Sequence, residues 1–246
     1  MSAREPAFPL VLKDARFTPP AAPTYYVLAS DGLYLHRDTP LFRASVPVAG
    51  GIPGLEPHGA RLELRLPRLP VRLLERAVGF FRAVYDRWGG EGILILFYAP
   101  PADGRGWRFA LGAPPQMIRG RFEAGRFHAE LRLEYGACAR PASDFFKLGT
   151  FHSHADAAAG HSTIDQHDEL YEAGLHLTAG AVHTDAPGFS AAFVVGQTRF
   201  ALRADAILPP FRTRRRFPPS WLEQVTVACG TAAPDWTGNG HGLAAR

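Results

Sequence analysis

Cysteine is nearly absent from this sequence, which has only Cys138 and Cys229 among its 246 residues. Two widely separated cysteines do not make a disulfide framework, so we expect a protein of a reducing compartment, the cytoplasm. Cys138 stands beside Gly136 and Ala137, and an isolated cysteine in that setting is typical of simple packing. This interpretation is favoured over a role for Cys138 as a nucleophile.

Long hydrophobic runs are missing as well. The chain has no stretch of about 18 uncharged apolar residues, whereas a membrane-spanning helix needs about 20. Its first residues, Met1 to Pro9, lack the apolar core of a secretory signal. A hydrophobic content of 46% is ordinary for a globular protein. The sequence therefore predicts a compact enzyme-sized chain that does not interact with membranes.

Lysine is scarce too, since only Lys13 and Lys147 occur, and arginine accounts for most of the net charge of +4. One concentrated basic run, Arg212 to Arg216, follows Pro209 and Pro210. We interpret this run as an exposed, solvated hinge, although it could meet an acidic partner. Nucleic acid is not expected as a partner because the chain lacks an interleaved aromatic platform, zinc-finger spacing and a glycine-rich phosphate loop.

Residues of metal-binding types, by contrast, are concentrated in one segment. His152 and His154 flank a single serine, and Asp165 follows His154 after ten intervening residues. The segment 147–152 has the composition of a strand, on which side chains two positions apart point to one face. Two neutral imidazoles and one carboxylate are ligands of catalytic zinc, which keeps a fourth position for water and lowers its pKa to about 7. This spacing is the main indication of function in the sequence.

The same aspartate has a purely structural interpretation. Ser162 stands three positions before Asp165, and a Ser-x-x-Asp step before a helix is a capping-box pattern. An alanine-rich loop is expected over residues 155–161. A helix is then expected to begin at this step and to stop near Gly174. The two interpretations are compatible, because a capped first turn also fixes a ligand carboxylate.

This pattern is similar to the signature of the JAB/MPN (JAMM) zinc metalloprotease family. The run from His152 to Glu169, followed by Gly174-Leu-His-Leu-Thr-Ala-Gly180, looks most like the prokaryotic branch of the PRTRC protein A type. The resemblance covers about residues 65 to 205. One departure is Ala155, where many family members have proline after the second histidine.

The resemblance implies a fold, a cofactor and a substrate class. It implies Zn²⁺ bound by His152, His154 and Asp165, and Ser162 as a hydroxyl donor to the tetrahedral oxyanion. The activity implied is that of an isopeptidase or peptidase cleaving at the C-terminus of a ubiquitin-like protein, in deconjugation or precursor processing. E1-like and E2-like proteins of the same bacterial operon, which serves in antiviral defence, are the implied partners.

The family also uses an upstream glutamate at the start of a strand that follows a long helix. Residues 70–88 have the apolar spacing of an amphipathic helix, which the glycine pair Gly89-Gly90 would end. Residues 91–98 then have the pattern of a buried strand, so we assign Glu91, at the junction, as the catalytic base. A solvated residue after a helix stop is the alternative interpretation of Glu91. Glu130 and Glu134 are fallback candidates on a strand where they are expected to face solvent.

Other polar residues receive lesser roles. His161 is expected to face water in the loop, and His176 to be a satisfied structural histidine on an apolar strand. His167 and Asp168 are candidates for orienting a metal ligand without touching the metal.

The expected fold class is α+β, with a JAB/MPN-like mixed β-sheet flanked by helices and a small β-rich N-terminal extension. The domains are residues 1–60 for the extension, 61–210 for the metalloprotease domain, and 211–246 for a basic, flexible tail. The expected strands are 25–29 and 31–35 as a hairpin, 61–66, 91–98, 107–111, 126–133, 147–152, 175–182, 190–195 and 198–202.

Two other functions remain to be weighed. A non-catalytic JAB/MPN scaffold could bind a ubiquitin-like protein or conjugation enzymes without cutting, although retention of Glu91 and all three ligands argues against it. An amidohydrolase also uses His-x-His, but its barrel needs about 250 residues with the pair on its first strand. Only 92 residues follow His154, which makes that alternative poor.

Overall fold

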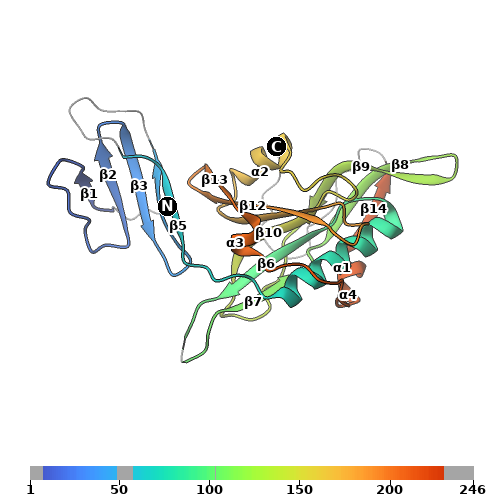
Figure 1. The fold of residues 1–246 in the computed structure, drawn as a ribbon. Helices are drawn as coiled ribbons and strands as arrows, with labels where there is room; N and C mark the ends of the chain where they lie inside the picture. The colour runs from blue at the N-terminus through green and yellow to red at the C-terminus, as the bar shows by residue number, and fades with distance from the viewer. Residues whose placement is uncertain (1–7, 49–57, 103, 230–246) are drawn as a thin grey trace, which may run out of the picture. The chain divides into compact units, whose positions relative to one another are not determined.

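The computed structural model describes residues 8–48, 58–102 and 104–229 (Figure 1). The chain divides into two compact units, one formed by Met1–Pro67 with Val194–Phe200 and the other by Arg68–Phe193 with Ala201–Arg246. The candidate metal ligands all belong to the second unit.

The N-terminal residues form a five-stranded sheet with the order β1-β2-β3-β4-β5. Its strands are β1 (Leu10–Leu12), β2 (Thr24–Ala29), β3 (Gly32–Asp38), β4 (Phe42–Pro47) and β5 (Arg61–Leu64). The predicted hairpin is confirmed, because β2 and β3 pair antiparallel around the turn at Ser30 and Asp31. Alternate residues of these strands are buried, and Tyr25, Val27 and Tyr34 form part of the core of this sheet.

A six-stranded mixed sheet has the order β13-β12-β11-β10-β6-β7. Its strands are β6 (Ile93–Ala99), β7 (Arg108–Gly112), β10 (Phe146–Ser153), β11 (Gly174–Gly180), β12 (Gly188–Val195) and β13 (Thr198–Leu202). The central strand β10 pairs parallel with β11 and antiparallel with β6. All of β11 and most of β6 is buried, as expected for strands with near-continuous apolar sequence.

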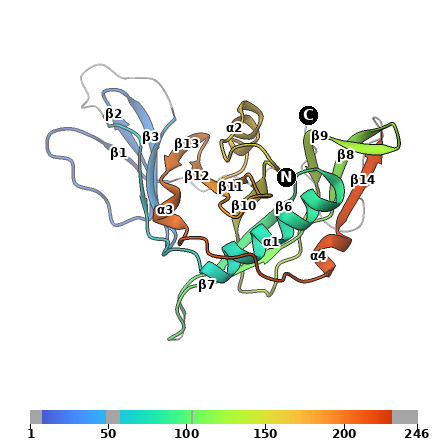
Figure 2. The ribbon, with the colours of Figure 1, turned by 45° about the vertical axis from the view of Figure 1, so that its right-hand side comes forward.

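The predicted long helix is confirmed as α1 (Val71–Trp88), which lies alongside the six-stranded sheet in both views (Figures 1 and 2). Its buried face includes Phe80 and Phe81, and the Phe81 ring meets that of Phe151 from β10 edge to face at 5.1 Å. Gly89 ends the helix in the left-handed conformation, with φ of 67°, and its N–H donates to the Tyr85 carbonyl. A residue without a side chain is suited to that conformation.

A third sheet has the order β14-β8-β9 and comprises β8 (Gln116–Glu123), β9 (Arg126–Tyr135) and β14 (Val225–Cys229). β14 pairs in parallel with β8, so residues 225–229 of the expected flexible tail form a strand. Two short helices, α3 (Ala204–Ile207) and α4 (Ser220–Glu223), precede it.

The expected solvated hinge at Arg212–Arg216 is also wrong in part. Arg214 pairs with Asp185 at 3.0 Å, and the Arg215 guanidinium pairs with the buried Glu75 of α1. The backbone N–H of Arg215 donates to the Glu75 carbonyl, at 3.0 Å. Arg215 therefore ties this segment to α1, and Arg214 ties it to the turn at residues 182–185. Arg212 and Arg216 are exposed, as expected for a solvated run.

The expected fold class is not what the structure has. Strands make up 42% and helices 15% of the described residues, so the fold is mostly β with three mixed or antiparallel sheets, and the α+β sheet flanked by helices is wrong. Of the four helices in the described part, α2 (Thr163–Glu169) has seven residues, α3 and α4 have four each, and only α1 is long. The alternating sequence that predicted many strands was therefore the better guide.

The described residues contain no helix that is both long enough and apolar enough to cross a membrane. Residues 1–7 and 49–57 of the expected N-terminal extension and residues 230–246 of the expected tail lie outside the described residues.

Candidate metal centre

His152 and His154 project from the end of β10 on one face of the sheet. Strand alternation sends the intervening Ser153 to the other face, where its hydroxyl oxygen accepts from the N–H of Gly92 at 3.0 Å. The same alternation places Phe151 on the face that α1 covers. The two imidazoles therefore project from the face opposite to α1.

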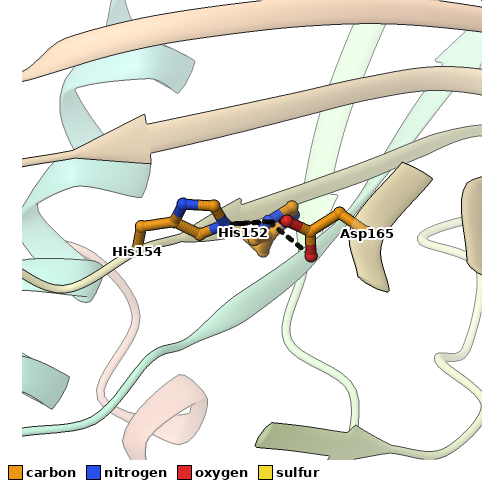
Figure 3. A group of neighbouring side chains, drawn as sticks. All are labelled: His152, His154 and Asp165. Carbon is orange, nitrogen blue, oxygen red and sulfur yellow. Dashed lines mark hydrogen bonds and ion pairs between the residues drawn. The ribbon is translucent and has the colours of Figure 1, made fainter. Parts of the chain in front are cut away.

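Asp165 reaches these imidazoles from the first turn of α2 (Figure 3). The capping box expected from the sequence is present, since the Ser162 hydroxyl accepts from the Asp165 N–H at 3.1 Å and the Asp165 carboxylate accepts from the Ser162 N–H at 2.7 Å. These two bonds fix the carboxylate against the start of the helix. The structural and metal-binding interpretations of Asp165 therefore hold together.

The donor atoms of the three residues converge closely. The Nε2 atoms of His152 and His154 are 3.1 Å apart, and Asp165 oxygens lie 3.0 Å from the Nε2 of His154 and 3.5 Å from that of His152. Zinc–ligand bonds of about 2.0–2.1 Å in a tetrahedron put neighbouring donors roughly 3.3 Å apart. The observed separations match this spacing, so the three residues form a group that can hold a metal ion.

The protonation pattern also suits a cation. The Nδ1 of His154 lies 3.2 Å from the Ala158 carbonyl oxygen, to which it can donate, so Nε2 is the nitrogen directed to the donor group. Without a metal, Nε2 carries the proton that is shared with Asp165, and a bound cation would replace that proton. The hydrogen bond to Asp165 raises the pKa of His154, against the opposing effect of burial. Burial acts to raise the pKa of Asp165, but hydrogen bonds from His152 and His154 outweigh it and hold that pKa far below its usual range. Asp165 is therefore an anion available for a ligand role.

Ala155 explains the departure from the family pattern. Its φ is 47°, in the left-handed region, and its carbonyl accepts from the Val182 N–H at 2.9 Å. Proline has φ fixed near −65° and could not adopt this conformation. The loop therefore leaves the strand by a route that excludes proline at this position.

Glu91 lies beside the histidines because β6 and β10 run antiparallel. His152 pairs with Ile93, and the Ser153 N–H donates to the Gly92 carbonyl at 2.9 Å, which continues the pairing beyond the strand. The next pair in this register sets Glu91 opposite His154. Burial raises the pKa of the Glu91 carboxyl, whereas the charges of His154 and His152 act to lower it. Both effects are those expected of a carboxyl that lies partly buried near the two imidazoles.

Ser162 is the N-cap residue of α2, and its hydroxyl oxygen accepts a bond from the helix. Its hydroxyl hydrogen is not needed for that bond. The exposed Ser162 side chain thus has a donor to offer next to Asp165.

His161 differs from its expected place in water. Its side chain is 5% exposed, and its Nδ1 lies 2.6 Å from a carboxylate oxygen of Glu169, which is equally buried. The His161 ring lies edge to face with that of His152, at 6.5 Å between centroids. The sequence offered one signal that was missed, since Asp165 and Glu169 are four residues apart and share a face of α2.

The remaining polar candidates lie away from the donor group. The prediction for His176 is confirmed, because its Nδ1 bonds with the Thr150 hydroxyl at 2.9 Å and its Nε2 with the Glu172 carbonyl at 2.9 Å. His167 is exposed on α2, with its ring against that of Tyr171.

The fallback carboxylates and Cys138 also lie outside the group. Glu134 forms a bidentate pair with Arg119 in the third sheet, and Glu130 is exposed on β9. Burial raises the pKa of the Cys138 thiol to about 11, which favours the packing role over a nucleophile.

Comparison of the chain with protein-family models and with curated proteins finds no match. What the structure establishes about function is therefore the metal-binding capacity of His152, His154 and Asp165.

Proposed function

We propose that this chain is a zinc-dependent peptidase or isopeptidase. The observation that carries the proposal is the convergence of two imidazole nitrogens and a carboxylate oxygen at 3.0–3.5 Å from one another, with Glu91 at the adjacent strand start. Three protein ligands leave one position open, as in catalytic rather than structural zinc sites. The proposal rests on this donor set and not on the fold.

The chemistry would be hydrolysis of an amide bond. Zn²⁺, when bound, would polarise the carbonyl and lower the pKa of water. Glu91 accepts the proton of the attacking water and delivers it to the departing amine, so that a C–O bond forms as the C–N bond breaks. Such positioned proton transfer contributes roughly 10²–10⁴-fold in rate. The Ser162 hydroxyl donates a hydrogen bond to the carbonyl oxygen as negative charge develops on it.

The substrate class comes from the resemblance of the motif to the JAB/MPN metalloproteases. On this basis the scissile bond lies at the C-terminus of a ubiquitin-like protein, and E1-like and E2-like proteins would be the partners. A non-catalytic scaffold that binds the same proteins is the alternative, which cleavage assays distinguish.

The first experiment measures metal content. Protein purified without added metal is analysed by mass spectrometry beside His152→Ala and, as a matched control, His167→Ala on the exposed side of α2. We expect about one zinc per chain in the parent and the control, and little in His152→Ala. Equal metal content in all three proteins would contradict the site.

The second experiment measures cleavage. A ubiquitin-like protein with a C-terminal extension is incubated with the parent protein, with the parent plus a chelator, and with Glu91→Ala. We expect cleavage only in the first sample. Metal binding by the parent without any cleavage would favour the scaffold, and equal cleavage in all three samples would exclude a metal-dependent mechanism.

A further inference from the structure

His161 has the hydrogen-bonding arrangement of a metal ligand, although it lies outside the group of three. Its Nδ1 bonds with the Glu169 carboxylate at 2.6 Å, while its Nε2 is buried and has no hydrogen-bond partner. Metal-bound histidines usually donate their second ring nitrogen to a carboxylate in this way. A buried polar atom without a partner costs about 1–3 kcal/mol, so a purely structural ion pair does not explain why Nε2 is left unmatched.

The ring also lies close to the donor group. The centroids of His152 and His154, whose Nε2 atoms are 3.1 Å apart, are separated by 5.0 Å, and those of His152 and His161 by 6.5 Å. The ring of His161 is thus only slightly further from the ring of His152 than is the ring of His154, which belongs to the donor group.

The local backbone provides for a movement of that size. The first part of the loop is fixed, because Ala155 and Ala157 accept backbone bonds from Val182 and Ala181, and the backbone around Ala158 packs closely on Gly180. Gly160, immediately before His161, has open space where a side chain would stand. A rotation at Gly160 that carries the imidazole would exchange two bonds, from the Gly160 N–H to the Ala158 carbonyl and from the Gln166 side chain to the His161 carbonyl, and would keep those of Ala155 and Ala157.

We infer that His161, oriented by Glu169, is a fourth protein ligand that closes the metal site in the absence of substrate. This inference rests on the proposed metal site, and it adds regulation to it. A site with four protein ligands has no open position, as in structural zinc sites, so water gains access only when the loop withdraws His161. Asp165 would then bind the ion and Glu169 would orient His161, both from one face of α2.

Metal affinity and cobalt spectroscopy test the inference without an activity assay. Zn²⁺ affinity is measured by competition with a chromogenic chelator, and Co²⁺ absorption reports the ligand set. We expect His161→Phe to weaken Zn²⁺ binding by about 10–100-fold and to change the Co²⁺ spectrum, and Glu169→Gln to weaken binding by a smaller factor. The exposed-histidine variant His167→Phe is the matched control and should behave as the parent.

The outcomes separate this inference from the proposed function. Parent-like affinity and an unchanged Co²⁺ spectrum in both His161→Phe and Glu169→Gln, with binding lost in His152→Ala, would overturn the fourth ligand and leave the three-residue site in place. If no variant loses Zn²⁺ binding, not even His152→Ala, both the fourth ligand and the three-residue site are overturned. If phenylalanine prevents folding, as judged by circular dichroism, Glu169→Gln decides alone, because it keeps the imidazole and removes only its orienting charge.

Discussion

At the scale of single residues, Asp165 makes two contacts that can be separated. Its carboxylate accepts from the Ser162 N–H at 2.7 Å and also lies 3.0 Å from the Nε2 of His154. An asparagine can keep the first contact through its carbonyl oxygen but lacks the negative charge that a cation attracts. The helix cap and the metal site therefore respond differently to the same substitution.

We expect Asp165→Asn to lower Zn²⁺ affinity by at least about tenfold while α2 stays folded. Chelator competition measures the affinity, and amide exchange over residues 163–169 reports the helix. Ser162→Ala is the complementary variant, since it removes the hydroxyl cap, costs about 1 kcal/mol and keeps the carboxylate. Unchanged affinity in Asp165→Asn would show that Asp165 is a capping residue only.

Ala155 is the residue where the backbone conformation restricts the sequence. With φ of 47° at Ala155, we expect Ala155→Pro to destabilise the protein by about 3 kcal/mol or more and to abolish metal binding, because the ring cannot adopt this angle. Ala155→Gly should keep metal binding, since glycine adopts positive φ readily. Urea unfolding and metal analysis of the two variants provide the measurements. A proline variant that binds metal as the parent does would show that the loop conformation is unnecessary.

At the scale of elements, close contact between α1 and the C-terminal segment depends on Gly79. A Cβ atom built on Gly79 would overlap the Arg215 carbonyl oxygen. The Arg215 backbone cannot move away easily, because its N–H donates to the Glu75 carbonyl of α1. The aromatic side chains of Phe217 and Trp221 pack edge to face on Phe80 at 5.6 and 5.8 Å. The segment therefore packs against the buried face of α1.

We expect Gly79→Ala to destabilise the second unit by about 1–3 kcal/mol, through overpacking that exceeds the gain in helix propensity. Gly106→Ala is the matched control, since open space surrounds Gly106. Urea unfolding followed by tryptophan fluorescence gives the free energies of unfolding. A stabilised Gly79→Ala variant would mean that the segment does not pack on α1 in solution.

At the scale of the whole molecule, the two units contain different buried ionisable groups. In the N-terminal sheet, burial lowers the pKa of His36 and of His58. The charges of Arg61 and Arg43 also lower the pKa of His36, whereas the charge of Asp38 raises it. The Nε2 of His58 lies 2.7 Å from the Ser45 hydroxyl, and the His36 ring stacks on Tyr25. Both imidazoles are therefore held in the neutral form.

This arrangement predicts that acid weakens the N-terminal sheet. With folded-state pKa values below the unfolded value of about 6.5, the unfolded chain binds more protons, so stability is present above that pH and falls as the pH decreases through it. Hydrogen exchange of peptides from β2 to β4 at pH 7.5 and 5.5, corrected for intrinsic rates, should show lost protection at the lower pH. The double variant His36→Gln, His58→Gln should lose this dependence. Equal corrected protection at both pH values in the parent would contradict the prediction.

Much of the fold could be predicted locally, but its class could not. The helix 70–88 and the hairpin at residues 25–35 were predicted because periodicity and turn residues specify them. Of the third sheet, only the strand 126–133 was predicted, which corresponds to β9. Its hairpin partner β8 was missed although the turn at Ala124 and Gly125 is local. The pairing of β14 with β8 was missed because β14 is far away in the sequence and no local pattern specifies such a partner. The two expected helices were real, but α2 is only seven residues long, and the strands outweigh both.

The candidate site divides in the same way. The spacing of His152, His154 and Asp165 was sufficient to predict that their side chains meet, because a strand, a loop and a capped helix turn are local features. Glu91 was assigned because the resemblance implied a glutamate at a helix–glycine–strand junction, and its role as a base stays a prediction. Its place opposite His154 follows from continuing the register of β6 and β10 two residues beyond the pair His152–Ile93. The contact of His161 with Glu169 was missed because it depends on how a flexible loop folds back on α2.

The antiparallel register of β6 and β10 decides whether Glu91 and the two imidazoles share one face. Directly opposed residues share a face, and a slip of one position would turn every side chain of one strand to the other side. The register shift between Lys147 and Gly149 already absorbs one residue of β10, and it lies before the histidines. One codon inserted between Glu91 and Ile93 would leave no strand length in which to absorb the extra residue, so Glu91 would lose its alignment with both imidazoles while every residue of the site stayed chemically intact.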